Sequence, residues 1–159
     1  MGGGSSNFAT SVQLLHDLFG LGKVPAELVT QSAKYGKDIP FFFSHQTCLL
    51  SEGFGEVLSP LPFDFHNKKL ILYSPPFSSS TVEAYARLKN LNTSFTERFL
   101  AQPTLNNIGN SFDEMFSLEM YQKLSSQFTG FHITGSGSCF WGLEKNDFRN
   151  CEIIETRFL

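Results

Sequence analysis

The chain has 159 residues, of which 41% are hydrophobic and 17% are charged, and its formal net charge is −3 at pH 7. Such a length and composition describe one folded domain, or one domain and part of a second, and exclude a disordered chain. No apolar run approaches the roughly 20 residues that span a bilayer, and no broad basic surface is available, so we expect neither a membrane nor a nucleic-acid partner.

The first segment is a glycine-rich turn, Met1-Gly2-Gly3-Gly4-Ser5-Ser6-Asn7. A flexible glycine and serine linker is one interpretation of it. However, apolar residues recur after it at helical steps and predict a helix from Ser6 or Asn7 to Gly20: Phe8, Val12, Leu15 and Phe19. Glycines that open a helix present unpaired N–H groups and the positive end of the helix dipole. The turn is therefore a candidate phosphate site, where Ser5 and Ser6 can add hydroxyls.

A second helix is predicted over residues 26–35 and is followed by a short connector, Gly36-Lys37-Asp38, which carries an acidic residue. We expect Gly36 to end the helix in the left-handed conformation, and Pro40 to fix the direction of the chain after Asp38. Residues 41–43 are three phenylalanines and are expected to start an apolar strand. A carboxylate held on such a short connector is a candidate catalytic group. The alternative is that Asp38 only accepts hydrogen bonds from turn or helix-end amides.

The next segment predicts a β-hairpin. Strand-like residues 46–50 and 56–58 flank a tight turn at residues 52–55. A further strand is expected over residues 68–74, which have a basic start and an apolar body. The change in composition near residue 67 marks the expected border between two domains, residues 1–67 and 68–159.

Three helical segments are predicted in the second domain. Ser80-Thr81-Val82-Glu83 has the pattern of a capping box and is expected to start a helix that continues to Leu88. Residues 91–100 indicate a short, irregular helical piece. Helical spacing predicts one long helix over residues 111–127, through Phe112, Met115, Phe116, Met120 and Leu124.

The remaining segments predict strands. Residues 131–134 and 139–143 flank a flexible polar turn, Gly135-Ser136-Gly137-Ser138, and a final strand covers residues 151–158. Strand, helix, helix and strands in this order indicate an α+β fold. We expect an antiparallel sheet from about Lys68, backed on one face by the helices near Ser80 and Ser111.

Cysteines and histidines give no metal-binding or disulfide pattern. The three cysteines are an odd number, and no two have the spacing of a zinc knuckle or a redox pair. A reducing environment suits such cysteines, and the N-terminus lacks the basic and apolar regions of a secretory signal. The expected location is therefore the cytoplasm.

Several segments, taken in order, resemble those of the GHMP kinases. The turn Gly2-Gly3-Gly4-Ser5-Ser6-Asn7 resembles the end of the family's phosphate loop, and Asp38-Ile39-Pro40-Phe41-Phe42 resembles its Asp-Val-Pro-Phe-Phe segment. Further segments resemble one branch of the family: Gly53-Phe54-Gly55-Glu56, Pro60-Leu61, residues 80–85, residues 110–113 and residues 134–139. No single motif would suffice, but the ordered set runs from Gly2 to about Leu143.

The resemblance implies a GHMP kinase-like two-layer sandwich. Residues 1–67 would be the end of the N-terminal ATP-binding domain, and residues 68–159 a ferredoxin-like C-terminal domain. The implied activity is ATP-dependent phosphorylation of a hydroxyl on the cytidine-diphosphate derivative of methylerythritol, a step toward isoprenoid precursors. The implied cofactors are ATP and Mg²⁺.

The resemblance also implies roles for individual residues. Asp38 matches the catalytic aspartate, and Thr81 and Tyr85 match substrate contacts, with the Tyr85 ring stacked on cytosine. The alternative for Tyr85 is that its ring lies on the buried face of the helix and packs in the protein core. The ATP-binding set comprises Gly2, Gly3, Gly4, Ser5 and Ser6, with Ser5 also at the metal ion.

Two departures from the family pattern limit these expectations. The family has roughly a hundred residues before the matched region, with the catalytic lysine among them, so we expect the chain alone to be inactive. Residues 144–150 are too few for the helix that usually precedes the last strand. The alternatives are a GHMP kinase for homoserine or a mevalonate, which would lack the Gly53-Phe54-Gly55-Glu56 pattern, and a binding fragment without catalysis.

Overall fold

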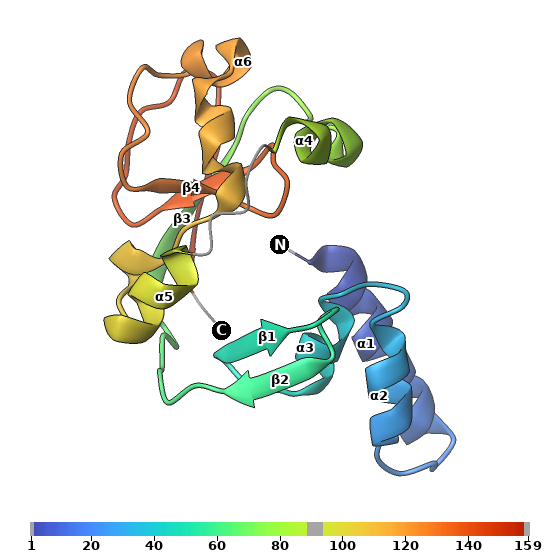
Figure 1. Cartoon of the computed structure of the whole chain (residues 1–159). Helices are drawn as coiled ribbons and strands as arrows, with labels where there is room; N and C mark the ends of the chain where they lie inside the picture. Colours follow the sequence, from blue (N-terminus) through green and yellow to red (C-terminus); the bar gives the residue numbers. More distant parts are fainter. Residues whose placement is uncertain (1, 89–93, 158–159) are drawn as a thin grey trace. The chain divides into compact units, whose positions relative to one another are not determined.

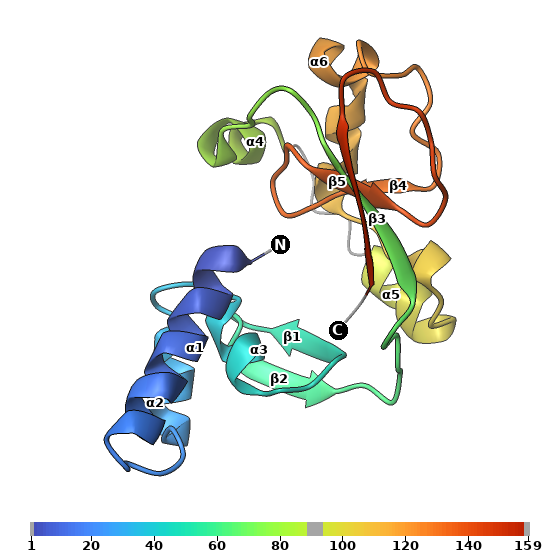
Figure 2. The same ribbon diagram turned by 180° about the vertical axis from the view of Figure 1, so that it is seen from behind.

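The computed structural model describes residues 2–88 and 94–157, which form two compact units. The first unit ends at Phe65 and the second begins at His66. Figures 1 and 2 show both units from opposite sides. None of the helices in the described ranges is long and apolar enough to cross a membrane.

The first unit combines three helices with a hairpin. The helices are α1 (Gly3–Leu18), α2 (Ala26–Ser32) and α3 (Ile39–Phe43). The strands β1 (Leu49–Glu52) and β2 (Val57–Pro60) pair antiparallel, which confirms the predicted hairpin. The small core is formed by Ala9, Ile39 and Phe43, with Val12, Val24, Val29 and Phe42 packed against it.

The prediction of a strand at residues 41–43 was wrong, because these residues belong to helix α3. Pro40 lies in the first turn of this helix, where a missing N–H group leaves no hydrogen bond unmade. Gly36 is not left-handed either. It lies in a tight place, because a Cβ built there would lie 3.2 Å from both the Ile39 side chain and Ser5 Oγ, which would have to shift slightly.

The second unit is built on a four-stranded antiparallel sheet with the order β4-β5-β3-β6. Its strands are β3 (Lys69–Ser74), β4 (Phe131–Ile133), β5 (Phe140–Gly142) and β6 (Glu152–Arg157). The helical segments are α4 (Thr81–Arg87), α5 (Ser94–Ala101), η1 (Leu105–Asn107), η2 (Ser111–Ser117) and α6 (Glu119–Gln122). The antiparallel sheet confirms the predicted α+β class.

Aromatic rings fill the core of the second unit. The fully buried Tyr73 of β3 stacks on Phe140 of β5 at 5.1 Å and meets Phe148 edge-on at 4.9 Å. The Tyr73 hydroxyl donates to the Glu144 carbonyl at 3.3 Å and accepts from the Asn146 N–H group at 2.8 Å.

The prediction of one long helix over residues 111–127 was wrong. The 3-10 helix η2 and helix α6 are separated by Leu118, whose backbone is extended at φ −69° and ψ 144°. Hydrogen bonds tie the start of η2 to strand β4, and Met115, Phe116, Tyr121 and Leu124 are all buried. These tertiary contacts outweigh the helical spacing of the sequence.

Two predicted ranges extend beyond the described residues. The helical piece expected over residues 91–100 corresponds to α5, and residues 91–93 lie outside the description. The final strand was expected to reach Phe158, which also lies outside it; β6 pairs with β3 as far as Arg157 opposite Lys69.

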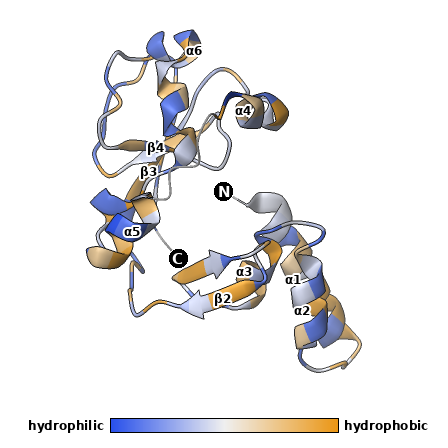
Figure 3. Cartoon of the chain, in the orientation of Figure 1, coloured by the Kyte–Doolittle hydropathy of each residue, from blue (hydrophilic) through white to orange (hydrophobic). Residues whose placement is uncertain are grey.

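Exposed apolar residues gather at the end of α1 and in the turn after it; Figure 3 colours the ribbon by the hydropathy of each residue. The side chains of these residues are 51–76% exposed: Leu14, Leu15, Leu18, Phe19 and Leu21. Contiguous exposed apolar surface of this kind favours association between molecules.

We predict that the double substitution Leu18→Lys and Phe19→Lys reduces self-association of the chain. Both side chains are mostly exposed, and positive charge at a helix C-terminus is favourable, so the fold should be retained. Sedimentation velocity over a concentration series measures the effect. Val82→Lys on α4 is the control, since Val82 is 78% exposed in the other unit. Equal self-association of the parent chain, the double variant and the control would show that the surface on α1 does not mediate self-association.

Candidate functional site

The start of α1 is the first part of the candidate site. Gly2 precedes the helix with φ 60° and ψ 26°, a left-handed conformation that suits glycine, and no side chain caps the first turn. The N–H groups of that turn therefore have no side-chain acceptor, and α1 is long enough to have a substantial dipole. The helix begins at Gly3 rather than at Ser6 or Asn7, so Gly3 and Gly4 lie within its first turn.

The two serines of this turn differ in their contacts. The Ser6 hydroxyl donates to the Gly3 carbonyl at 3.0 Å, within the helix itself. Ser5 Oγ lies instead beside Gly36, where a built Cβ would be 3.2 Å away. Ser5 is thus the serine that faces the acidic connector.

Asp38 lies next to the glycine turn. A Cβ built on Gly2 would lie 3.9 Å from Asp38 Oδ2 and 2.9 Å from the Phe42 ring. Asp38 precedes α3 but makes no capping hydrogen bond with its side chain, and it is exposed. The helix-end alternative for Asp38 is therefore wrong, and its carboxylate is available beside the open start of α1.

The β1–β2 turn fixes the connector from the other side. Gly55 has φ 100°, and a Cβ there would lie only 1.9 Å from the Lys37 carbonyl oxygen. The Lys37 ammonium lies 5.4 Å from the centroid of the Phe54 ring, and the Phe54 N–H group donates to Glu56 Oε2 at 2.7 Å. The Gly53-Phe54-Gly55-Glu56 motif thus holds the residue that precedes Asp38.

We predict that Gly55→Ala destabilises the first unit by at least about 2 kcal/mol, because both the positive φ and the contact with Lys37 oppose a side chain. Urea unfolding measures the loss. Gly20→Ala is a matched control: Gly20 also has a positive φ, at 62°, but nothing lies within 4 Å of its built Cβ. If the two substitutions cost the same, the contact between the turn and Lys37 contributes nothing.

In the second unit, hydrogen bonds hold the Gly135-Ser136-Gly137-Ser138 turn. The Asn110 amide donates to the Ile133 and Gly135 carbonyls at 2.8 Å each. Ser79 donates to the Ser136 carbonyl at 3.2 Å, and the Tyr121 hydroxyl donates to the Ser138 carbonyl at 3.0 Å. Burial raises the pKa of Tyr121, so its hydroxyl remains a donor. The turn was expected to be flexible, and the structure shows it hydrogen-bonded to side chains from three other segments.

Asp113 joins η2 to strand β4. Its carboxylate accepts the Ile133 N–H group at 2.7 Å and the Asn110 N–H group at 3.1 Å, and it lies 2.6 Å from His132 Nδ1. Residues 110–113 were identified by resemblance, and the spacing of Asn110 and Asp113 is that of the capping box observed here. Nothing in the sequence pointed to His132. Within residues 2–88 and 94–157, no group of three or more His, Cys, Asp or Glu residues is arranged to hold a metal ion.

Thr81 and Tyr85 both lie on α4. The Thr81 hydroxyl is 3.0 Å from the Ser136 hydroxyl, so Thr81 lies beside the glycine turn. Tyr85 is 61% exposed and meets Phe112 edge-on at 5.0 Å. The core-packing alternative for Tyr85 is therefore wrong, since most of this side chain is open to solvent.

A solved structure defines the class of protein to which this fold belongs. The crystal structure of a 4-(cytidine 5'-diphospho)-2C-methyl-D-erythritol kinase superposes on the chain with a TM-score of 0.62 and 25% sequence identity, over 89% of this chain and 56% of the other. The fold is accordingly that of the GHMP kinases. No protein-family model matches the chain.

Curated relatives extend the likeness to the sequence. A 4-diphosphocytidyl-2-C-methyl-D-erythritol kinase of Protochlamydia amoebophila is 35% identical over 89% of this chain and 51% of the relative. That of Buchnera aphidicola is 32% identical over 98% and 53%. A rice protein of the same name, described as chloroplastic, is 32% identical over 100% and 46%. The chain is a homologue of the 4-diphosphocytidyl-2-C-methyl-D-erythritol kinases and spans about half the length of these relatives.

Proposed function

We propose that these residues form part of an ATP-dependent kinase that phosphorylates the 2-hydroxyl of 4-diphosphocytidyl-2-C-methyl-D-erythritol, in the methylerythritol phosphate route to isoprenoid precursors. The observation that carries the proposal is the position of Asp38 Oδ2 beside Gly2, at the uncapped start of α1. The names of the relatives support the same chemistry. In this proposal, the first unit belongs to the ATP-binding domain and the second unit to the C-terminal domain of a GHMP kinase.

The start of α1 would bind the phosphate groups of ATP. Gly2, Gly3 and Gly4 have no side chains to obstruct a phosphate, and nothing lies within 4 Å of a Cβ built on Gly3 or Gly4. The N–H groups of the first turn and the helix dipole attract negative charge there. Ser5 and Ser6 complete the proposed set, with Ser5 better placed because the hydroxyl of Ser6 is bound within the helix.

Asp38 would act on the attacking hydroxyl. Phosphoryl transfer requires mainly positioning and neutralisation of charge, and a carboxylate can accept or orient the hydroxyl proton. Its lack of a capping hydrogen bond leaves it free for this contact. Mg²⁺ prefers oxygen ligands, and the Ser5 hydroxyl and the Asp38 carboxylate are oxygen donors near the same turn, so they suit a phosphate-bound Mg²⁺ that would neutralise charge.

Tyr85 and Thr81 would contact the substrate. An exposed ring held at one edge by Phe112 can stack on a nucleobase, whereas homoserine or a mevalonate offers no ring to stack on. This exposure, together with the packed Gly53-Phe54-Gly55-Glu56 turn, favours the cytidine nucleotide over the smaller alcohols. The remaining alternative is a binding fragment without catalysis.

We also propose a cytoplasmic location. Cys48, Cys139 and Cys151 are all free thiols, as a reducing compartment requires. Burial raises the pKa of the Cys48 and Cys151 thiols, so neither is an activated nucleophile. The rice relative is named chloroplastic, so members of the family also occur in plastids.

We predict that Asp38→Asn lowers kcat by at least about a hundredfold and leaves the affinity for ATP nearly unchanged, because the carboxylate acts in the transition state. A coupled assay measures this with the chain joined to the preceding segment of a bacterial relative. The 159 residues alone should show no turnover, since the relatives are about twice as long.

Glu52→Gln is the matched control, an exposed carboxylate at the end of β1. It should keep the parent turnover. If Asp38→Asn kept full turnover and only melted at a lower temperature, Asp38 would be structural.

We predict that Tyr85→Leu weakens binding of the cytidine nucleotide by at least about fivefold, as expected for loss of a base–aromatic stack. Tyr85→Phe keeps the ring and should bind nearly as well as the parent protein. Calorimetric titration of the joined protein with CDP measures both. Unchanged CDP affinity in Tyr85→Leu would mean that the ring only packs on Phe112.

A further inference from the structure

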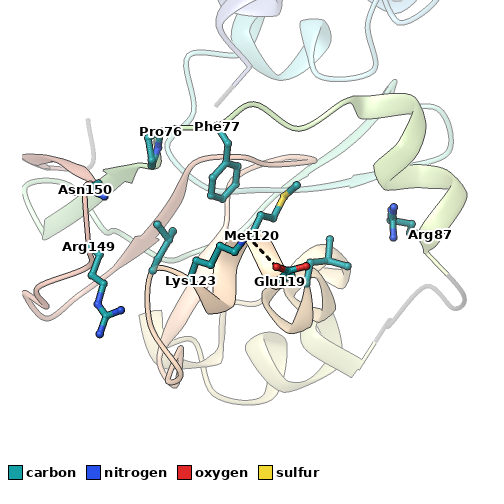
Figure 4. A pocket seen from close by; sticks show the side chains of 10 residues that line it. Pro76, Phe77, Arg87, Glu119, Met120, Lys123, Arg149 and Asn150 are labelled. Atoms are coloured by element: carbon teal, nitrogen blue, oxygen red, sulfur yellow. Dashed lines mark ion pairs between the residues drawn. The ribbon is translucent and has the colours of Figure 1, made fainter.

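A groove in the second unit lies outside the site described above, and we propose that it binds a small amphipathic anion: a phosphate or carboxylate group attached to an apolar body. The groove has a volume of about 750 Å³, within the range of pockets that take small organic ligands. Figure 4 shows Phe77 and Met120 near its centre, with Arg87 and Arg149 on opposite sides in this view. This inference does not depend on the proposed kinase function.

The floor of the groove is apolar. Leu124 is 5% exposed and belongs to the core, and Phe77 meets the buried Tyr121 ring edge-on at 5.1 Å. Met120 is 39% exposed, and its flexible thioether can adapt to ligands of different shapes. An apolar chain or ring in the groove would cover surface that now faces water.

The rim of the groove is basic. Lys123 pairs with Glu119 at 2.9 Å, whereas Arg87 and Arg149 have no side-chain hydrogen bond or ion pair with any described residue. Three cations and one carboxylate thus line a groove in a chain whose net charge is −3. Guanidinium groups bind phosphates and carboxylates through paired hydrogen bonds. An anionic head group is therefore the complement of this rim.

Arg149 is held by its backbone. Its N–H group donates to the Leu124 carbonyl at 3.4 Å, and Cys151 N–H donates to the Phe148 carbonyl at 3.3 Å. Asn150 between them is left-handed at φ 57°, a conformation that asparagine tolerates in tight turns. Phe148 is 2% exposed and anchors this turn in the core. The backbone of Arg149 is thereby fixed at the rim.

Methionine NMR tests the proposal on the unaltered chain. The chain has only three methionines, of which Met120 lines the groove and Met115 is 5% exposed and lies outside it. Titration with decyl phosphate, below its micelle concentration, should shift the ¹³C-methyl signal of Met120 and leave that of Met115 in place. Decanol and inorganic phosphate, which each supply one half of the ligand, should bind at least about tenfold more weakly. The same titration with decanoate shows whether the groove prefers a phosphate or a carboxylate head group. Preference for either one supports the proposal.

The double variant Arg87→Gln/Arg149→Gln tests the rim. It should weaken decyl phosphate binding by at least about tenfold, because two charge-assisted contacts are lost. Arg98→Gln is the control, since Arg98 lies on α5 over the Phe95 ring and outside the groove. The proposal is overturned if decanol binds the unaltered chain as tightly as decyl phosphate, if Met115 shifts together with Met120, or if the folded double variant keeps the parent affinity.

Discussion

The first unit depends on a steric constraint: Gly36 and Gly55, which have no Cβ, leave room for close contacts on both sides of Lys37. Gly36 lets the connector touch Ser5 and Ile39, and Gly55 lets the hairpin turn touch the Lys37 carbonyl. The connector is thereby fixed from both sides, with Asp38 at its end beside Gly2. A mobile carboxylate would lose much of its effect in catalysis, because the rate depends on the geometry of the reacting groups. The close contacts at these two glycines and the proposed catalytic role of Asp38 therefore have the same physical origin.

In the second unit, hydrogen bonds rather than close steric contacts hold a turn in place. Asn110 and Asp113 lie at the start of η2, and both bind the backbone of β4 and the turn that follows it. Tyr121 adds a bond from within the aromatic core, where its hydroxyl would be costly without an acceptor. A turn rich in glycine and serine is thus hydrogen-bonded by side chains that come from elsewhere in the fold. Local composition alone does not show these contacts.

Sequence patterns predicted the elements whose signals are local. The hairpin, the helix start at Ser80 and the antiparallel strands depend on turn residues, capping and alternation, and all are present. The three phenylalanines at 41–43 were misassigned because a short apolar run fits a buried helix as well as a strand. The break at Leu118 and the pairing of His132 with Asp113 follow from tertiary contacts, which no spacing along the chain encodes. The position of Asp38 on a short connector was predicted, but its proximity to Gly2 and the close contacts at Gly36 and Gly55 were not.

The position of β3 in its sheet has a consequence for the order of events during synthesis. Both of its neighbours, β5 and β6, come much later in the sequence, and Lys69 pairs with Arg157. While the ribosome makes residues 75–139, the hydrogen-bonding edges of this apolar strand have no sheet partner among the strands described. Pairings over such distances along the chain form slowly, and unpaired strand edges promote aggregation. The sheet can therefore be completed around β3 only after β6, at residues 152–157, has been synthesised.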